Sequence, residues 1–169
     1  MTAESQMRTH MNKLLILLLL TSLNLTLNAQ EIEEFFTPEH PFTHLFDTTI
    51  HETKISWRFE TIHNNYIIQE FEEEGTIFRV KYRDFQLRVI TPNSNQVFNK
   101  MYFQDSIGFD PEMFTMKLLG LEGYDEQTNE LQFFLTITKP ETDWTYPIYL
   151  YVNMDGVSRF ELPTFEDDY

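Results

Sequence analysis

A strict alternation of apolar and polar residues begins at Lys54, and it constrains the fold of this chain more than any other feature. Ile55, Trp57 and Phe59 fall on one side of an extended backbone, while the residues between them are polar or charged. A period of two is typical of a β-strand with one face in solvent. Comparable segments recur as far as Leu162, and we expect seven or eight strands, at 54–60, 66–72, 76–82, 84–91, 97–103, 131–137, 145–152 and 157–162.

Short turn-forming segments separate these strands. They are His63-Asn64-Asn65, Glu72-Glu73-Glu74-Gly75, Pro92-Asn93-Ser94-Asn95, Lys139-Pro140-Glu141-Thr142-Asp143 and Asn153-Met154-Asp155-Gly156. Asn and Gly tolerate positive φ, and an Asp-Gly step is a strong hairpin signal. Neighbouring parallel strands would need long crossovers, so these short connections predict an antiparallel meander. We therefore expect a mostly β fold, a sheet that forms either a sandwich or a partly open barrel.

One short helix is expected at about 111–119. Asp110 is a suitable N-cap, Pro111 stands at the first helical position, and Gly120 would end the helix. Phe114 and Leu118 are four residues apart and would share its apolar face.

The first 29 residues have the pattern of a secretory signal peptide. Lys13 precedes an apolar block at 14–20, and the small residue Ala29 offers a cleavage site. The block is shorter than the roughly 20 apolar residues that span a bilayer, which favours a cleaved signal peptide over an uncleaved anchor. We expect the remainder to be exported, either periplasmic or fully secreted, with translation beginning at Met1 or Met11.

Four segments follow from these patterns. We expect a signal peptide at 1–29, an extended N-terminal arm at 30–53, a single β domain at 54–165 and an acidic tail at 166–169.

Charge and cysteine content exclude several classes of function. The formal net charge is −15, which repels the phosphates of nucleic acid and disfavours binding to anionic membranes. The sequence contains no cysteine, so it has no disulfide, no thiolate metal site and no cysteine nucleophile. A lipid on an N-terminal cysteine is excluded in the same way, and we expect no stable membrane insertion after the leader is removed.

The stretch from about Thr76 to Leu162 resembles a family of small exported domains of unknown function from Gram-negative bacteria. The features that carry the resemblance are, in order, Asp84-Phe85-Gln86-Leu87-Arg88-Val89, Val97-Phe98-Asn99-Lys100-Met101-Tyr102-Phe103, Leu118-Leu119-Gly120-Leu121, Leu131-Gln132-Phe133, Pro140-Glu141-Thr142-Asp143, Pro147-Ile148 and Asp155-Gly156. Members of the family are typically lipoproteins with a cysteine at the end of the leader, and this chain lacks that cysteine. The resemblance implies no catalytic or binding residues.

Two groups of polar residues are candidates for metal sites. His40 and His44 have the spacing of a helical metal pair beside Glu39, but Pro41 between them opposes a helix. The acidic run at 70–74 lacks the spaced aspartate–glycine loop of a calcium-binding EF-hand. We expect no metal and no cofactor, and surface histidines and a solvated turn instead.

Aromatic residues are the candidates for a binding surface. Tyr149 and Tyr151 share one face of their strand, and aromatic rings on an exposed sheet can stack on sugars or hold a peptide. The alternative is that this face belongs to the core. The candidate set is Trp57, Trp144, Tyr146, Tyr149 and Tyr151.

No nucleophile elbow, metal-hydrolase helix or phosphate-binding loop is present in the sequence, and we expect no catalytic residues. The sequence favours a non-enzymatic exported module that binds a protein, peptide or envelope glycan. The alternatives are a small hydrolase whose site forms only on folding, and a structural component of the cell envelope.

Overall fold

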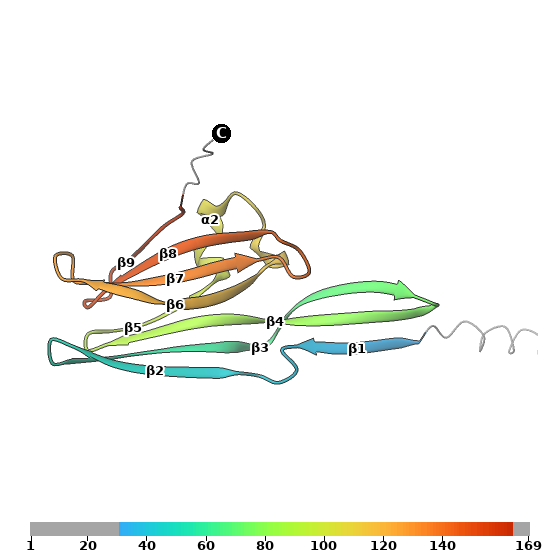
Figure 1. Cartoon of the computed structure of the whole chain (residues 1–169), viewed down its shortest axis with the longest axis horizontal. Coiled ribbons are helices and arrows are strands. Elements are labelled where there is room, and N and C mark those ends of the chain that lie inside the picture. The colour runs from blue at the N-terminus through green and yellow to red at the C-terminus, as the bar shows by residue number, and fades with distance from the viewer. Residues whose placement is uncertain (1–30, 164–169) are drawn as a thin grey trace, which may run out of the picture. The chain divides into compact units, whose positions relative to one another are not determined.

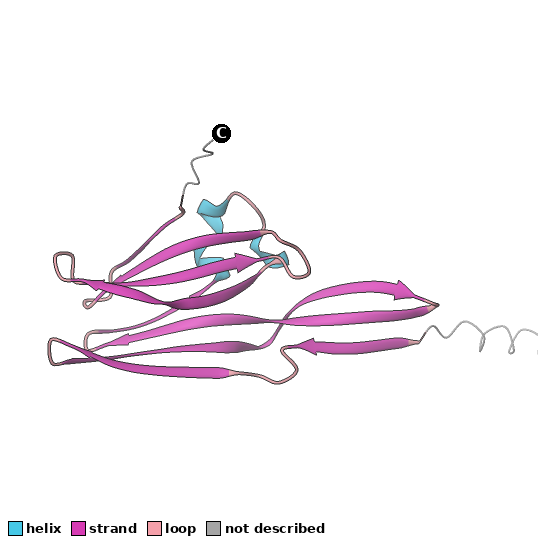
Figure 2. Ribbon diagram, viewed as in Figure 1, coloured by secondary structure: helices cyan, strands magenta, loops and turns pink. Residues whose placement is uncertain are grey.

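A computed structural model of the chain describes residues 31–163. Within this range lie nine strands and three short helical segments (Figures 1 and 2). The strands are β1 (Ile32–Thr37), β2 (Thr43–Ile50), β3 (Thr53–Glu73), β4 (Thr76–Thr91), β5 (Ser94–Asn99), β6 (Thr115–Asp125), β7 (Glu130–Thr138), β8 (Thr145–Asn153) and β9 (Ser158–Glu161), and the helical segments are η1 (Lys100–Phe103), α2 (Gln104–Ile107) and η2 (Pro111–Met113). The predicted signal peptide at 1–29 and the acidic tail at 166–169 lie outside the described residues.

The chain divides into two compact units. Among the described residues, the first unit comprises 31–33 and 70–79, and the second comprises 34–69 and 80–163. No helix in the described part of the chain is long and apolar enough to cross a membrane.

The first unit contains the turn that joins β3 to β4. Glu74 and Gly75 both have positive φ, at 50° and 85°, so the sequence prediction of a turn at 72–75 is confirmed. Close to the turn, the rings of Phe71 and Phe78 stack with their centroids 5.3 Å apart. Arg79 Nε lies 2.5 Å from Glu70 Oε1. Cross-strand pairs of this kind stabilise a hairpin locally.

In the second unit, two sheets pack face to face. One sheet has the strand order β1-β4-β3-β2, with β5 also paired to β4, and the other has the order β6-β7-β8-β9 (Figure 1). Trp57 of β3 meets Phe133 of β7 between the sheets, with ring centroids 5.8 Å apart. The core cluster that both sheets share is Ile55, Trp57, Phe59, Leu87, Val89, Phe98, Phe103, Ile107, Phe114, Met116, Leu131, Phe133, Leu135, Ile137, Ile148, Leu150 and Val152.

The mostly β, largely antiparallel fold predicted from the sequence is therefore confirmed, as two sheets that do not close into a barrel. The strand count is wrong, because nine strands in sheets of five and four replace the expected seven or eight. Two of the expected connections do not interrupt a strand. Asn64 has a φ of 56° but lies inside β3, and β4 runs without a break through Arg83. A residue with positive φ also fits a local irregularity that twists a strand without reversing it.

The helix expected at 111–119 is wrong beyond its first turn. Asp110 does act as a cap, since its Oδ1 accepts a hydrogen bond from Glu112 N, 2.9 Å away. The turn ends at Met113, and β6 then pairs antiparallel with β7 from Thr115 onward. Two register shifts interrupt this pairing, between Leu118 and Gly120 and between Leu121 and Gly123. Pairing with β7 and burial of Met116 outweigh the helical propensity of this short segment.

Helical structure occurs earlier in the chain. The strand expected at 97–103 ends at Asn99, whose Oδ1 accepts a hydrogen bond from Met101 N and so caps η1. The segment that includes η1, α2 and η2 contributes Phe103, Ile107 and Phe114 to the core.

The N-terminal segment expected to be an extended arm supplies two strands. β2 pairs antiparallel with β3, from Thr43 opposite Glu60 to Ile50 opposite Thr53. β1 runs beside β4 in the same direction (Figure 1). The loop between β1 and β2 is held by Arg83, whose Nε and Nη2 donate to the carbonyl oxygens of Pro38 and Glu39.

Candidate functional site

The five aromatic residues singled out from the sequence lie in different environments. Trp57 is a core residue: only 8% of its surface is exposed, and it stacks on Phe46 with ring centroids 5.4 Å apart. Its other neighbour is Phe133 of the opposite sheet. Trp57 therefore holds the two sheets together and does not offer an exposed ring to a ligand.

Tyr149 and Tyr151 lie on the face of β8 that points away from the core. The core face of this strand is formed by Ile148, Leu150 and Val152, which are fully buried. Tyr149 stacks on Phe134 of β7, with ring centroids 5.0 Å apart. The outer surface of the four-stranded sheet is therefore partly aromatic, as the binding hypothesis requires.

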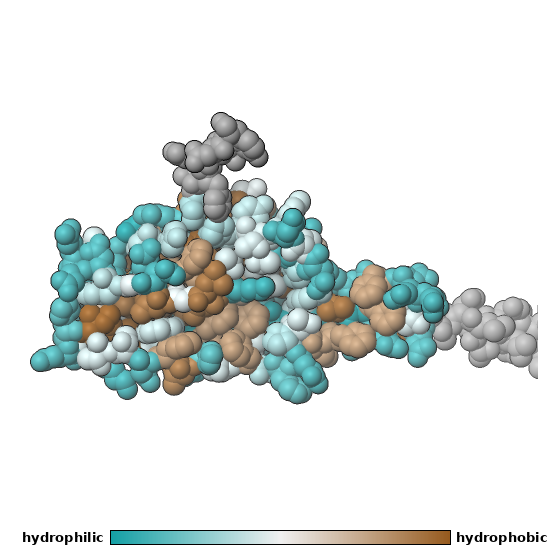
Figure 3. Space-filling model, in the orientation of Figure 1, coloured by the Kyte–Doolittle hydropathy of each residue, from teal (hydrophilic) through white to brown (hydrophobic). Residues whose placement is uncertain are grey.

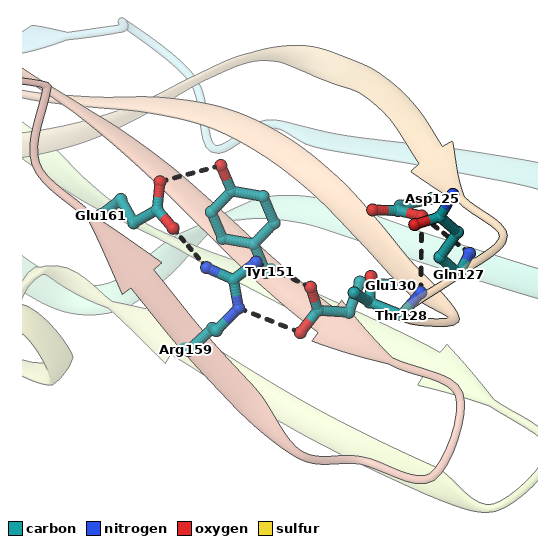
Figure 4. Close-up of polar contacts among 7 residues, drawn as sticks. All are labelled: Asp125, Gln127, Thr128, Glu130, Tyr151, Arg159 and Glu161. Atoms are coloured by element: carbon teal, nitrogen blue, oxygen red, sulfur yellow. Dashed lines mark hydrogen bonds and ion pairs between the residues drawn. The ribbon is translucent and has the colours of Figure 1, made fainter.

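The side chain of Tyr151 contacts two residues of the same sheet, Arg159 and Glu161 (Figure 4). The Arg159 guanidinium carbon lies 3.8 Å from the ring centroid, and Tyr151 Oη donates to Glu161 Oε2 at 3.2 Å. Arg159 also donates two hydrogen bonds to Glu130, at 3.1 and 2.8 Å, which lower the pKa of the Glu130 carboxyl. Burial, followed by the charge of Glu161, raises the pKa of the Tyr151 phenol. The charged groups of this cluster therefore pair with one another, and Arg159 covers one face of the Tyr151 ring.

The other group in Figure 4 closes the turn between β6 and β7. Asp125 Oδ1 accepts hydrogen bonds from Gln127 N at 2.8 Å and from Thr128 N at 3.4 Å. The bond from Gln127 is the main cause of the lowered pKa of the Asp125 carboxyl. An Asp that accepts backbone donors two and three residues ahead is a common turn device.

Trp144 and Tyr146 lie close to the turn between β7 and β8. Trp144 is 57% exposed, and Lys139 Nζ lies 5.0 Å from its ring centroid. Tyr146 stacks on Phe109, with ring centroids 4.2 Å apart. The structure thus brings Tyr149 and Tyr151 to one face and separates Trp57, Trp144 and Tyr146 from them.

A cleft between the two sheets, entirely within the second unit, is the more defined site. Its volume is about 630 Å³, and both sheets contribute apolar residues to its lining. Phe42, Phe59 and Phe85 contact one another in edge or stacked geometry on the five-stranded side. Leu118 and Leu119 of β6 lie on the other side. The full lining is Thr37, Pro38, Phe42, Phe59, Tyr82, Arg83, Phe85, Thr115, Lys117, Leu118, Leu119, Thr138, Lys139, Pro140, Glu141 and Thr142.

A smaller hollow of about 290 Å³ continues from the cleft. It shares Phe42, Phe59, Leu118 and Leu119 with the cleft and adds residues of β2, β3 and β6. β2 and β6 are the outermost strands of their sheets. Figure 3 shows apolar surface along the line where the two sheets face each other. Cleft and hollow together form an apolar groove beside two sheet edges.

One polar pair lies within the cleft. Tyr82 is 7% exposed, and its Oη donates to Glu141 Oε1 at 2.7 Å. Burial, then the hydrogen bond and charge of Glu141, raises the pKa of Tyr82 to about 12. The phenol is therefore protonated at neutral pH and acts as a hydrogen-bond donor. A nucleophilic tyrosinate would instead need a lowered pKa.

The remaining polar groups of the cleft are mainly cationic. Arg83, Lys117 and Lys139 line it, and Glu141 is the one carboxylate among the described residues that do so. The cleft can bind an apolar group through its walls and a polar group at its cationic lining.

This site could not be predicted from the sequence, because its members come from distant segments that converge only on folding. Phe59 and Phe85 are recognisable as strand residues. The alternation of apolar and polar residues does not distinguish a residue of the core from one that lines the cleft. The gathering of Arg83, Lys117 and Lys139 at one lining is visible only in three dimensions.

The other polar candidates do not converge. His44 of β2 packs against Phe46, with ring centroids 4.9 Å apart, and His40 Nε2 lies 3.8 Å from Glu39 Oε1 in the preceding loop. No group of three or more metal-binding side chains occurs within residues 31–163. In the acidic run of the first unit, Glu70 pairs with Arg79.

No protein-family model matches the chain, and no curated protein matches it. The resemblance to exported domains of Gram-negative bacteria stays a prediction.

Proposed function

We propose that this chain is a non-enzymatic binding domain of an exported protein, and that its ligand inserts an apolar group into the cleft between the sheets. Export rests on the pattern of residues 1–29. The observation that carries the proposal is the cleft of about 630 Å³, whose walls are formed by the rings of Phe42, Phe59 and Phe85 and by Leu118 and Leu119. Cavities of roughly 300–1,000 Å³ with apolar walls and a few polar groups are typical of ligand sites.

Leu119 gives the cleft exposed apolar surface that a ligand can cover. Leu119 lines both the cleft and the adjoining hollow, and it is 58% exposed. Burying such a side chain against a ligand removes apolar surface from water, at about 25 cal/mol per Å². An apolar group is therefore favoured over a glycan, whose hydroxyls would find few partners among these walls.

The test compares two leucines of similar exposure. Leu45 of β2 is 55% exposed and lies outside the cleft lining, so Leu45→Gln is the control for Leu119→Gln. The neutral fluorophore N-phenyl-1-naphthylamine serves as probe, because its emission rises in apolar surroundings. We expect saturable binding that Leu119→Gln weakens about five- to tenfold, the factor for roughly 1 kcal/mol or slightly more. Leu45→Gln should leave it unchanged. Absence of saturable binding, or equal loss in both variants, would contradict the proposal.

A further inference from the structure

The cationic side chains of this acidic chain are distributed unevenly. Residues 31–163 contain ten lysines and arginines, in a protein whose net charge is −15. Six of them lie within 4.0 Å of a carboxylate oxygen: Lys54, Arg58, Arg79, Lys81, Lys100 and Arg159. The other four are Arg83, Arg88, Lys117 and Lys139, and all but Arg88 line the cleft. In an acidic protein most cationic side chains are expected to lie close to a carboxylate. Three cationic side chains without a carboxylate partner at a single site therefore require an explanation.

Arg83 is fixed in place without being neutralised. Its Nε donates to Pro38 O at 3.0 Å, its Nη2 to Glu39 O at 3.3 Å, and its Nη1 lies 3.5 Å from Tyr66 Oη. These partners are uncharged oxygens, so the guanidinium keeps its full positive charge. An arginine has five N–H donors, and two of them are left for a ligand.

The two lysines add further cations to the same lining. Lys139 Nζ lies over the Trp144 ring, a contact that holds an ammonium group without cancelling its charge. Lys117 stands next to Leu118 on the edge strand β6. On the opposing side, Glu141 already accepts the hydrogen bond of Tyr82. With three cations and one carboxylate, the lining carries a formal charge of about +2.

Local charge outweighs the net charge at this site. At physiological ionic strength the Debye length is about 8 Å, so carboxylates elsewhere on the surface are screened from the cleft. A ligand with an anionic head and an apolar body satisfies both parts of the lining at once. A cationic amphiphile would place its charge against Arg83, Lys117 and Lys139.

We propose that the ligand of the cleft is a single-chain anionic amphiphile of the fatty-acid class. Its hydrocarbon chain lies along the phenylalanine and leucine walls and continues into the adjoining hollow. Its carboxylate binds Arg83, Lys117 and Lys139. This inference rests on the proposed function and adds the charge of the ligand to it.

The experiment uses three ligands with the same dodecyl chain: dodecanoate and dodecyltrimethylammonium, each below its critical micelle concentration, and dodecanol below its solubility limit. Displacement of N-phenyl-1-naphthylamine from the intact domain reports their affinities. We expect dodecanoate to bind about tenfold or more tightly than dodecanol, and dodecyltrimethylammonium to bind most weakly. The double substitution Lys117→Gln/Lys139→Gln should weaken dodecanoate about tenfold and leave dodecanol unchanged.

Arg88 provides the matched control. It lacks a carboxylate partner but lies outside the cleft, where its Nη1 donates to Asn95 Oδ1 at 3.1 Å. Arg88→Gln removes the same kind of charge and should leave all three affinities unchanged. Equal affinity for the three ligands, or equal effects of the Arg88 and lysine substitutions, would overturn the inference while the apolar site itself stands. If the neutral probe does not bind in the first place, the proposed function fails as well.

Discussion

Asp84 and Lys100 form a buried ion pair in the second unit. Lys100 Nζ lies 3.1 Å from Asp84 Oδ2, with 5% and 1% of the two side chains exposed. Lys100 Nζ also donates to the carbonyl oxygens of Glu112 and Phe114, at 3.2 and 2.7 Å. Asp84 accepts from Asn65 Nδ2 and from the backbone N–H of Phe85. The pair joins β4 to η1, and the further hydrogen bonds of Lys100 reach η2 and Phe114, so every polar side-chain atom of the pair has a partner.

We expect Lys100→Met to destabilise the protein by about 3–5 kcal/mol, because it leaves a buried carboxylate without its cation. The double variant Lys100→Met/Asp84→Leu should lose less than the sum of the two single losses, since no charge is then left unpaired. Urea unfolding of the four proteins measures the coupling. The exposed pair Lys54–Asp47, 4.0 Å apart, is the control, and Lys54→Met should cost less than about 1 kcal/mol. Strictly additive losses at Asp84 and Lys100 would contradict this account.

Neither partner of this pair could be predicted from the sequence. Asp84 and Lys100 lie 16 positions apart, and both fall in strands expected from the sequence, at 84–91 and 97–103. A period of two assigns polar residues to the solvent face. The pattern does not show that both side chains become buried once the chain folds.

At the scale of elements, turns are better predicted than helices. The Asp155-Gly156 step is confirmed: Asn153 Oδ1 accepts from the N–H groups of Asp155 and Val157, and Gly156 has a φ of 87°. Turn chemistry is local, and four consecutive residues determine it. The helix expected at 111–119 depends on local capping as well, but pairing with β7 is a long-range contact that no local signal reveals.

Gly156 has a second reason to be glycine. A Cβ there would lie 2.5 Å from Ser94 Oγ and 2.7 Å from Ser94 Cβ, and Gln96 Nε2 donates to the Gly156 carbonyl oxygen. The turn after β8 therefore packs against β5 of the other sheet. We expect Gly156→Ala to destabilise the protein by about 2–4 kcal/mol, through positive φ and steric overlap together. Thermal or urea unfolding measures the loss.

Gly108 separates the two causes. Its φ is 72°, but nothing lies within 4 Å of the position that a Cβ would take, so Gly108→Ala should show the backbone cost alone, about 1–2 kcal/mol. Ser94→Gly should recover part of the stability lost in Gly156→Ala and none of that lost in Gly108→Ala. Equal losses at the two glycines would show that Ser94 contributes nothing.

At the scale of the whole molecule, the fold class follows from alternation, whereas the candidate site does not. Alternation assigns a residue to one of two faces but leaves open which sheet faces it. Phe42, Phe85 and Leu118 come from a loop and two strands that share no sequence motif. Their convergence depends on sheet order, and sheet order is determined by packing between residues far apart in sequence. For the same reason Trp57 could be placed on an apolar face, but its burial between β2 and β7 could not.

That burial makes Trp57 a reporter of contact between the sheets. Its neighbours are Phe46 of the same sheet and Phe133 of the other, so separating the sheets must expose the indole. In Trp144→Phe, Trp57 is the single tryptophan, and we expect its red shift in urea to coincide with the loss of β-sheet circular dichroism. The shared core cluster requires this coincidence, because neither sheet can keep its apolar face buried alone. The companion variant Trp57→Phe retains the exposed Trp144, whose emission should shift little. A red shift of Trp57 at lower urea than the loss of sheet signal would show that the sheets separate before they unfold, and that the sandwich is two weakly coupled layers.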